Sequence, residues 1–219
     1  MKKILIICFS LVFITPIFSQ KRDITLDDLW KNYAFYPKSM GGFNSMNDGE
    51  HYSTIEKTED GQEIIKYQFK NGKKVRILFK SADFEIPKIG KYIFSENEKQ
   101  LLLATETKSI YRYSSKSVYY IYDIHNDKIS KLSDKKVMYA TFSPQGDKVA
   151  YVLDNNLFIK DIKSGTITQV TSDGKKNHII NGASDWVYEE EFALVRSFEW
   201  APDGEHIAYY KFDETHVKE

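Results

Sequence analysis

The sequence is poor in cysteine and carries no net charge, and each absence excludes a class of chemistry. Cys8 is the only cysteine among the 219 residues, so neither disulfides nor thiolate sites are expected after it. The 31 basic and 31 acidic residues balance, and because no basic stripe is present, nucleic acid is not an expected partner. No histidine pair has the spacing of a metal site, so we expect no metal and no cofactor.

Catalytic motifs are also absent. No stretch reads G-x-S-x-G, the turn that exposes a serine nucleophile, and there is no P-loop and no dinucleotide-binding glycine set. We therefore expect no catalytic residue in this chain, which by itself should be inactive. What the sequence does have is 42% hydrophobic and 15% aromatic residues, enough to build a globular core.

The first residues have the pattern of a secretory signal peptide. Two lysines precede an apolar stretch at residues 4–18, and Ser19 follows it. We predict a signal peptide at residues 1–19, cleaved after Ser19, and export of residues 20–219 to the periplasm or the exterior. The stretch is short for a membrane span and a proline interrupts it, so an uncleaved anchor is the disfavoured alternative. Cys8 lacks the position and neighbours of a lipoprotein cleavage site.

A repeat organises the rest of the chain. Its clearest unit, at residues 140–170, reads ATFSPQGDKVAYVLDNNLFIKDIKSGTITQV. Valine, isoleucine, tyrosine and threonine favour strands, whereas the proline, glycine and asparagine clusters between them favour tight turns. The unit therefore predicts four short strands, at residues 138–142, 149–153, 157–161 and 166–170.

The same motif recurs three more times. FEWAPDGEHIAYY matches it closely, YIFSENEKQLLLA matches it without the glycine, and NSMNDGEHYS is a weaker copy. The matching positions are Ser45, Phe94, Phe142 and Trp200, which are 49, 48 and 58 residues apart. Four antiparallel strands in each unit of about 40–50 residues are typical of β-propeller blades. We predict an all-β fold, an incomplete propeller of about three to four blades.

Two segments depart from the repeat. Phe94 to Leu132 spans 38 positions where Phe142 to Val170 spans 28, and the extra residues lie in TETKSIYRYSSKS, which contains Arg112. The other departure is the long link before the last copy, which contains NGASDWVYEEEF. Because strands alternate in direction, loops after a second strand and links between blades emerge on the same face. Both departures should therefore lie together, where sites tend to be built.

The run DWVYEEEF predicts a short helix with a candidate cation site. Ser184 or Asp185 could cap the helix. Glu190 and Glu191 would then diverge by about 100°, yet glutamate is long enough for both to reach one small cation. An ammonium group suits them better than a metal, because no histidine is close in sequence. The alternatives are a solvated acidic face and, for Arg112, a stacking or surface role.

These motifs resemble those of a known family. NGASDWVYEEEF and FEWAPDGEHIAYYKFDET, with TLDDLW, MNDGEHY and YYIYDI, are similar to the N-terminal propeller of the dipeptidyl peptidase IV family, in the prolyl oligopeptidase clan of serine peptidases. The similarity runs from Thr25 to the last residue. It implies that an eight-bladed propeller caps an α/β-hydrolase domain and that the substrate binds between them.

The resemblance also implies a function for the two departures. Glu190 and Glu191 would hold the free N-terminal ammonium of a peptide, and Glu189 would have a structural or supporting role. Arg112 would contact the carbonyl of the penultimate substrate residue. The full-length protein would then be a serine exopeptidase that releases X-Pro or X-Ala dipeptides. A related tripeptidyl peptidase is the enzymatic alternative.

The chain departs from the family in length. About 200 mature residues suffice for four blades at most, so the catalytic Ser, Asp and His would lie downstream. We interpret the chain as an N-terminal fragment or a truncated gene product. The implied partners are peptides with a free N-terminus and the missing α/β-hydrolase domain, and the family allows a homodimer of the full-length form. A non-enzymatic propeller that binds peptides or proteins is the alternative.

Overall fold

The computed structural model describes residues 23–37 and 42–218. The predicted signal peptide at residues 1–19 lies outside the described residues. The chain divides into two compact units, residues 1–40 and 41–219. In the first unit, helix α1 (Leu26–Trp30) begins after Thr25, whose hydroxyl accepts from the N–H of Asp28 while the Asp28 carboxylate accepts from the N–H of Thr25. This capping box satisfies main-chain donors that a helix start leaves unpaired.

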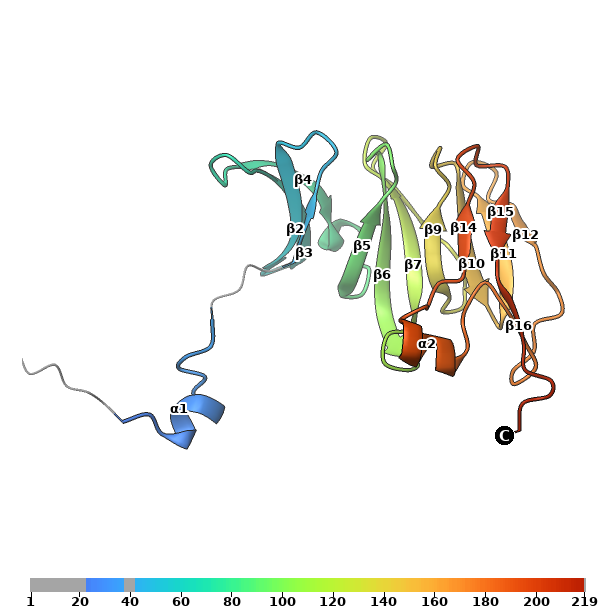
Figure 1. The fold of residues 1–219 in the computed structure, drawn as a ribbon. Coiled ribbons are helices and arrows are strands. Elements are labelled where there is room, and N and C mark those ends of the chain that lie inside the picture. The colour runs from blue at the N-terminus through green and yellow to red at the C-terminus, as the bar shows by residue number, and fades with distance from the viewer. Residues whose placement is uncertain (1–22, 38–41, 219) are drawn as a thin grey trace, which may run out of the picture. The chain divides into compact units, whose positions relative to one another are not determined.

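Three four-stranded antiparallel sheets form most of the second unit, and we call them blades 1, 2 and 3 (Figure 1). In each blade the strands pair in sequence order, and the four strands expected in residues 140–170 are present in blade 3. Blade 1 holds β1 (Phe43–Ser45), β2 (His51–Thr58), β3 (Gly61–Gln68) and β4 (Lys74–Lys80), and a short 3-10 helix, η1 (Ser81–Phe84), follows it; blade 2 holds β5 (Ile89–Phe94), β6 (Gln100–Ser109), β7 (Ser115–Asp123) and β8 (Lys128–Lys131); blade 3 holds β9 (Met138–Phe142), β10 (Lys148–Leu153), β11 (Asn156–Asp161) and β12 (Ile167–Gln169).

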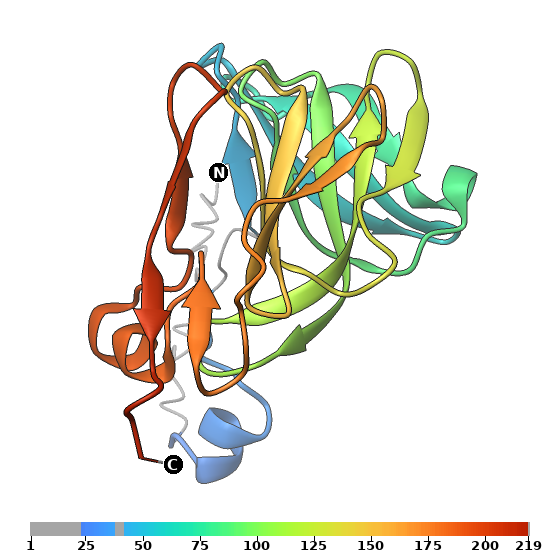
Figure 2. The same cartoon turned by 90° about the vertical axis from the view of Figure 1, so that its right-hand side faces the viewer.

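The last copy of the repeat is incomplete. The remaining elements are β13 (Ile179–Asn181), α2 (Trp186–Phe192), β14 (Phe198–Trp200), β15 (Ile207–Tyr209) and β16 (Lys211–Asp213). Strands β14 and β15 pair with each other, and β16 runs antiparallel to β13 (Figure 2). The prediction of an all-β, incomplete propeller is thus confirmed, whereas β13 and its pairing with β16 were not predicted. Among the described residues, no helix has the length and apolarity needed to cross a membrane.

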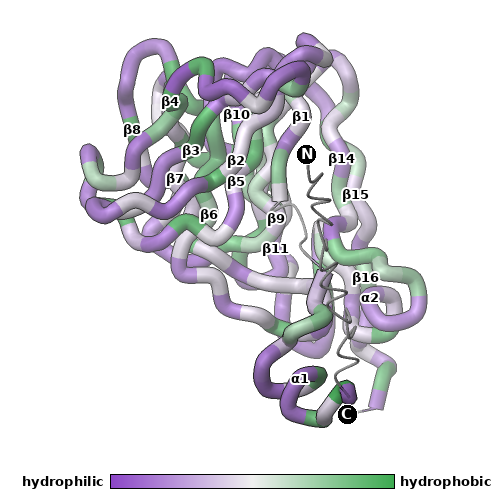
Figure 3. The backbone as a smooth tube through the Cα atoms, turned by 90° about the vertical axis from the view of Figure 1, so that its left-hand side faces the viewer, coloured by the Kyte–Doolittle hydropathy of each residue, from purple (hydrophilic) through white to green (hydrophobic). Residues whose placement is uncertain are grey.

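The cores lie between successive blades. Successive side chains of a strand point to opposite faces of its sheet, so in β6 Leu101 and Leu103 pack toward blade 1 while Leu102 packs toward blade 3. In β10, Val149 contacts the core shared with blade 2, and Ala150 contacts the core shared with the last copy. Both faces of these strands are covered, which explains their continuous apolar sequences. Figure 3 shows the hydrophobic segments within the blades and hydrophilic stretches at the turns.

The turns after the first strand of each copy are also joined to one another. The side-chain amide of Asn47 donates to the carbonyl of Glu96 (2.6 Å), and that of Asn97 donates to the carbonyl of Gln145 (3.5 Å). The side-chain amide of Gln145 donates in turn to the carbonyl of Pro202 (3.2 Å). These hydrogen bonds connect all four copies at one end of the blades.

The inserted residues of blade 2 do not form the loop that their sequence suggested. They lengthen the hairpin instead: β6 continues to Ser109 and β7 begins at Ser115. The pairing shifts register between Thr105 and Lys108 and then resumes, and the N–H of Ile110 closes the turn on the carbonyl of Ser114. The paired ends of β6 and β7 therefore hold the five-residue turn at 110–114 in place.

Candidate functional site

Helix α2 is held at both ends by local hydrogen bonds. The Asp185 carboxylate accepts from the N–H of Tyr188 at 2.8 Å, so Asp185 is the N-cap. Ser184, the other candidate cap, donates its hydroxyl to the carbonyl of Leu194 instead, which ties the chain entering the helix to the chain leaving it. The helix ends at Ala193, in the left-handed conformation common at helix C-termini.

Glu189 anchors α2 to blade 2. Its side chain is 2% exposed, and its Oε1 accepts from the main-chain N–H groups of Tyr113 (2.8 Å) and Ser114 (2.9 Å) in the β6–β7 turn. Burial by itself would raise the pKa of Glu189, but the hydrogen bonds from the Ser114 hydroxyl and from the two N–H groups together lower that pKa. Glu189 is therefore a buried, ionised carboxylate whose acceptor capacity is used within the protein.

Glu190 and Arg112 form an ion pair across the same contact. Arg112 Nε lies 2.9 Å from Glu190 Oε2, and the side chains are 66% and 18% exposed, respectively. Glu191 follows on the helix and is exposed, and its carboxylate has no ion-pair or hydrogen-bond partner among the residues the structure describes. The structure thus brings Arg112 and the three glutamates together, with a different environment for each carboxylate.

Both departures from the repeat lie at one end of the blades, as predicted from strand direction. Figure 1 shows α2 beside the ends of β6 and β7, and the hydrogen bonds to Glu189 establish the contact. The joined turns of the four copies lie at the other end, where β6 begins. A groove of about 1160 Å³ lies on that side.

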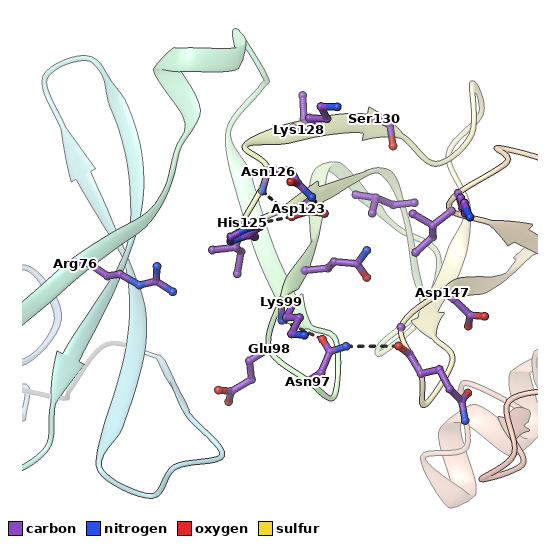
Figure 4. Close-up of a pocket in the computed structure, with 18 residues that line it drawn as sticks. Arg76, Asn97, Glu98, Lys99, Asp123, His125, Asn126, Lys128, Ser130 and Asp147 are labelled. Atoms are coloured by element: carbon purple, nitrogen blue, oxygen red, sulfur yellow. Dashed lines mark hydrogen bonds between the residues drawn. The ribbon is translucent and has the colours of Figure 1, made fainter.

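The groove contains none of the predicted site residues. Figure 4 shows Arg76 of blade 1 directed toward it, opposite His125 of blade 2. One of its three acidic residues, Asp123, accepts from the N–H groups of His125 and Asn126, so this carboxylate stabilises a turn. The groove is therefore separate from the glutamates and does not contribute to the candidate site.

The chemistry of the site favours a small organic cation. Arg112 already balances one carboxylate, whereas Glu191 adds a negative charge that no described residue pairs. An ammonium group offers three donors that two carboxylates can share. In the part of the chain that the structure describes, no group of three or more His, Cys, Asp or Glu side chains is arranged to hold a metal. Glu191 is thus the carboxylate of the site that is left to accept donors from outside the described residues.

The N–H groups of Tyr113 and Ser114 are the part of the site that the sequence did not reveal. They lie 76 and 75 residues from Glu189 in the chain. Main-chain donors are present at nearly every residue, so no residue type marks them. The position of the turn next to Arg112, within an insertion, was the only available signal.

Comparison with known proteins identifies the family. The family model for the dipeptidyl peptidase IV (DPP IV) N-terminal region matches residues 95–219, more than half of the chain and including both Arg112 and the glutamates. The chain belongs to the dipeptidyl peptidase IV family. This confirms the resemblance found in the sequence motifs, and it assigns residues 95–219, which hold most of blade 2, blade 3 and the last copy, to the N-terminal region of that family.

Solved structures and curated relatives agree. The crystal structure of Porphyromonas gingivalis dipeptidyl peptidase 4 matches 88% of this chain and 28% of that chain, with a TM-score of 0.78 and 40% identity. Prolyl endopeptidase FAP of Homo sapiens is 30% identical over 199 residues, which cover 90% of this chain and 25% of the relative. Probable dipeptidyl-aminopeptidase B of Chaetomium globosum is 32% identical over 185 residues, 78% of this chain and 20% of the relative. The chain thus spans about a quarter of the length of these dipeptidyl peptidase family members.

Proposed function

We propose that this chain supplies the substrate-amine site of an exported serine dipeptidyl peptidase. The observation that carries the proposal is the arrangement at α2: Glu189 fixes the helix to the β6–β7 turn, and Arg112 pairs with Glu190 beside Glu191. Glu190 and Glu191 would hold the N-terminal ammonium of a peptide, and Arg112 would contact the carbonyl of its penultimate residue. Family membership supports the reaction class.

The ion pair of Arg112 with Glu190 reduces the repulsion between neighbouring carboxylates. Without Arg112, Glu190 and Glu191 would repel each other on one short helix. Arg112 reduces this repulsion, and its side chain is largely exposed, so it can turn while Glu190 accepts a new donor. A guanidinium carries five N–H donors, enough to keep a bond to Glu190 and donate another to a substrate carbonyl. The incoming ammonium then supplies the second positive charge.

Carboxylates at fixed positions can determine how many residues are released from the N-terminus of a peptide. If they hold the ammonium at a set distance from a nucleophile, only the bond after the second residue reaches that nucleophile, and the enzyme releases dipeptides. The serine, aspartate and histidine of the reaction, and the pocket that selects proline or alanine, belong in this proposal to an α/β-hydrolase domain outside these residues. The proposal includes export through the signal peptide at residues 1–19, and it allows a homodimer.

The test compares two substrates that differ only at the amine. The full-length protein should cleave Gly-Pro-p-nitroanilide and should cleave its N-acetylated form far more slowly, because the acetyl group removes the charge that pairs with the glutamates. Dipeptide release should be confirmed by mass spectrometry on a longer peptide. Equal kcat/KM values for the two substrates would contradict the proposed amine site.

A further inference from the structure

Strand β6 contains a bulge close to the candidate site. The register of its pairing with β7 shifts between Thr105 and Lys108. Two residues of β6, Glu106 and Thr107, thus lie opposite Ser117 alone. Glu106 has a φ of +48°, in the left-handed region that residues other than glycine seldom occupy. Bulges bend a strand and are over-represented next to active sites.

A lysine from the link between blades 2 and 3 holds this bulge. The ammonium of Lys136 donates to the main-chain carbonyl of Glu106 at 2.7 Å, and the Glu106 carboxylate lies 3.5 Å from the same Nζ. The lysine side chain is 33% exposed and the glutamate side chain is 47% exposed. Because exposed ion pairs contribute little to stability, the charge-assisted hydrogen bond to the carbonyl is the stronger of the two contacts.

Further hydrogen bonds join the bulge to the same link. Thr107 Oγ1 lies 2.8 Å from Ser117 Oγ, which connects the two strands across the bulge. The N–H of Ser117 donates to the carbonyl of Val137 at 3.0 Å, and the N–H of Val137 donates back to the carbonyl of Ser117 at 2.9 Å. Val137 directly follows Lys136, so this main-chain pair fixes the point from which the lysine side chain extends.

Paired residues lead from the bulge to the candidate site. Pairing resumes at Lys108 and continues to Ser109, where β6 ends. The turn at 110–114 then carries Arg112 and the two N–H groups that bind Glu189. Because a bulge changes the direction and twist of its strand, its conformation determines where this turn meets α2.

We propose that Lys136 is a positioning residue for the amine site; this inference rests on the function proposed above. Lys136 holds the carbonyl of Glu106, and the bulge sets the direction in which the end of the β6–β7 hairpin extends. The hairpin end then presents Arg112 and the main-chain donors to α2. Lys136 acts through the hairpin and does not itself bind the substrate.

The decisive variant is Lys136→Met in the full-length protein, which keeps an unbranched side chain and removes the ammonium. Loss of the hydrogen bond to the carbonyl should raise KM for Gly-Pro-p-nitroanilide about two- to tenfold, with kcat changed less. KM does not depend on the amount of folded enzyme. A purely structural role would therefore lower the apparent kcat and leave KM unchanged.

Two further variants sharpen the test. Lys135→Met is the matched control, because the ammonium of this neighbouring lysine pairs with Asp154 of blade 3 at 3.1 Å; its KM should stay at the wild-type value. Glu106→Gln removes the ion pair but keeps the main-chain carbonyl, so its KM should stay within about twofold of wild type. A rise as large as that of Lys136→Met in either variant would overturn the role assigned to the carbonyl contact.

The outcomes separate this inference from the proposed function. A rise in KM confined to Lys136→Met supports the positioning role. If wild type prefers the free amine over the acetylated substrate but Lys136→Met keeps the wild-type KM, the positioning role is wrong and the amine site stands. If wild type shows no preference for the free amine, both proposals fail.

Discussion

At the scale of single residues, three consecutive carboxylates coexist because each is stabilised differently. Successive residues of a helix point about 100° apart, so neighbouring side chains meet different surroundings. Glu189 is buried against two main-chain N–H groups, Glu190 is paired with Arg112, and Glu191 faces solvent. Hydrogen bonds thus offset the negative charge of Glu189, and the ion pair offsets that of Glu190. The charge of Glu191 remains available to a bound cation.

The first prediction concerns Glu190 and Glu191 in the full-length protein. Losing one partner of a desolvated charge pair costs about 2–5 kcal/mol, so Glu190→Gln or Glu191→Gln should lower kcat/KM on free-amine substrates by about thirty- to several-thousand-fold. Arg112→Ala should cost less, because its proposed partner on the substrate is a neutral carbonyl. Steady-state kinetics with Gly-Pro-p-nitroanilide measures the effects.

The matched control is Glu59→Gln, which changes an exposed glutamate in the β2–β3 turn of blade 1. It should keep wild-type kinetics. If both site variants also keep the wild-type kcat/KM, the glutamates are a solvated acidic face and do not bind the amine.

The second prediction concerns the pH dependence of Glu189. Hydrogen bonds to a charged group contribute about 1.5–3 kcal/mol, so Glu189→Gln should lower the melting temperature at neutral pH. The pKa of Glu189 in the folded protein lies below its ordinary value of 4.5. The stabilisation is therefore complete above that ordinary value and is lost as the pH falls through the lower, folded-state pKa. The melting temperatures of wild type and Glu189→Gln should converge at acidic pH. A difference that stays constant over the whole pH range would contradict the role of the ionised Glu189.

At the scale of elements, the site is built where two insertions contact each other. The long β6–β7 hairpin supplies Arg112 and the N–H pair, and the link between β13 and β14 supplies α2. Helix α2 has only seven residues, too few to be stable alone. Its order therefore depends on the cap at Asp185 and on the hairpin.

The third prediction tests this dependence. Replacing residues 106–115 by the short turn of blade 3, Asp154-Asn155, would remove Arg112 and both main-chain donors to Glu189. Amide hydrogen exchange at residues 186–192 should then accelerate strongly, since local opening would no longer break the Glu189 contacts. Exchange in β10 and β11 is the internal control and should be unchanged. Unaltered protection of α2 would show that the helix does not need the hairpin.

At the scale of the whole molecule, each blade is stabilised by its neighbours. The three cores lie between successive sheets, so a blade at an end has one face without such a partner. Strands β14 and β15 pair only with each other among the described residues, and Tyr210 nearby is 67% exposed. On α2, Trp186 and Phe192 are 55% and 70% exposed.

The fourth prediction follows from these exposed groups. Unpaired strand edges and large apolar surfaces favour association, so the isolated 219-residue chain should self-associate. Sedimentation velocity at increasing protein concentration measures this. A monodisperse monomer with a sharp, cooperative melt would contradict the prediction and would favour a self-sufficient small propeller.

The fifth prediction is that this chain alone hydrolyses nothing. The sequence shows no nucleophile elbow, and nothing in the site provides a nucleophile with its base. Purified chain with Gly-Pro-p-nitroanilide should give the rate of buffer alone. Turnover that co-purifies with the chain and is blocked by a serine-directed reagent would overturn the prediction.

The sequence by itself determined the blades and the family, and it limited the cap of α2 to Ser184 or Asp185. Strand alternation and turn residues are local signals, because each depends on residues close together in the chain, and the recurrence of the motif at Phe94, Phe142 and Trp200 can be read from the sequence directly. The alternating direction of the strands was enough to predict that Arg112 and the glutamates lie at the same end of the blades. The motif DWVYEEEF was enough to indicate the family.

Only the tertiary structure decided how the three glutamates differ. The donors to Glu189 are main-chain groups about 75 residues away, and any residue type could supply them. The pairing of β13 with β16 likewise joins segments that are far apart in the chain, and the extension of β6 and β7 through the insertion had no marker in the residue pattern. Such contacts leave no local pattern, because the free energy that favours them comes from burial and hydrogen bonding in the assembled blades.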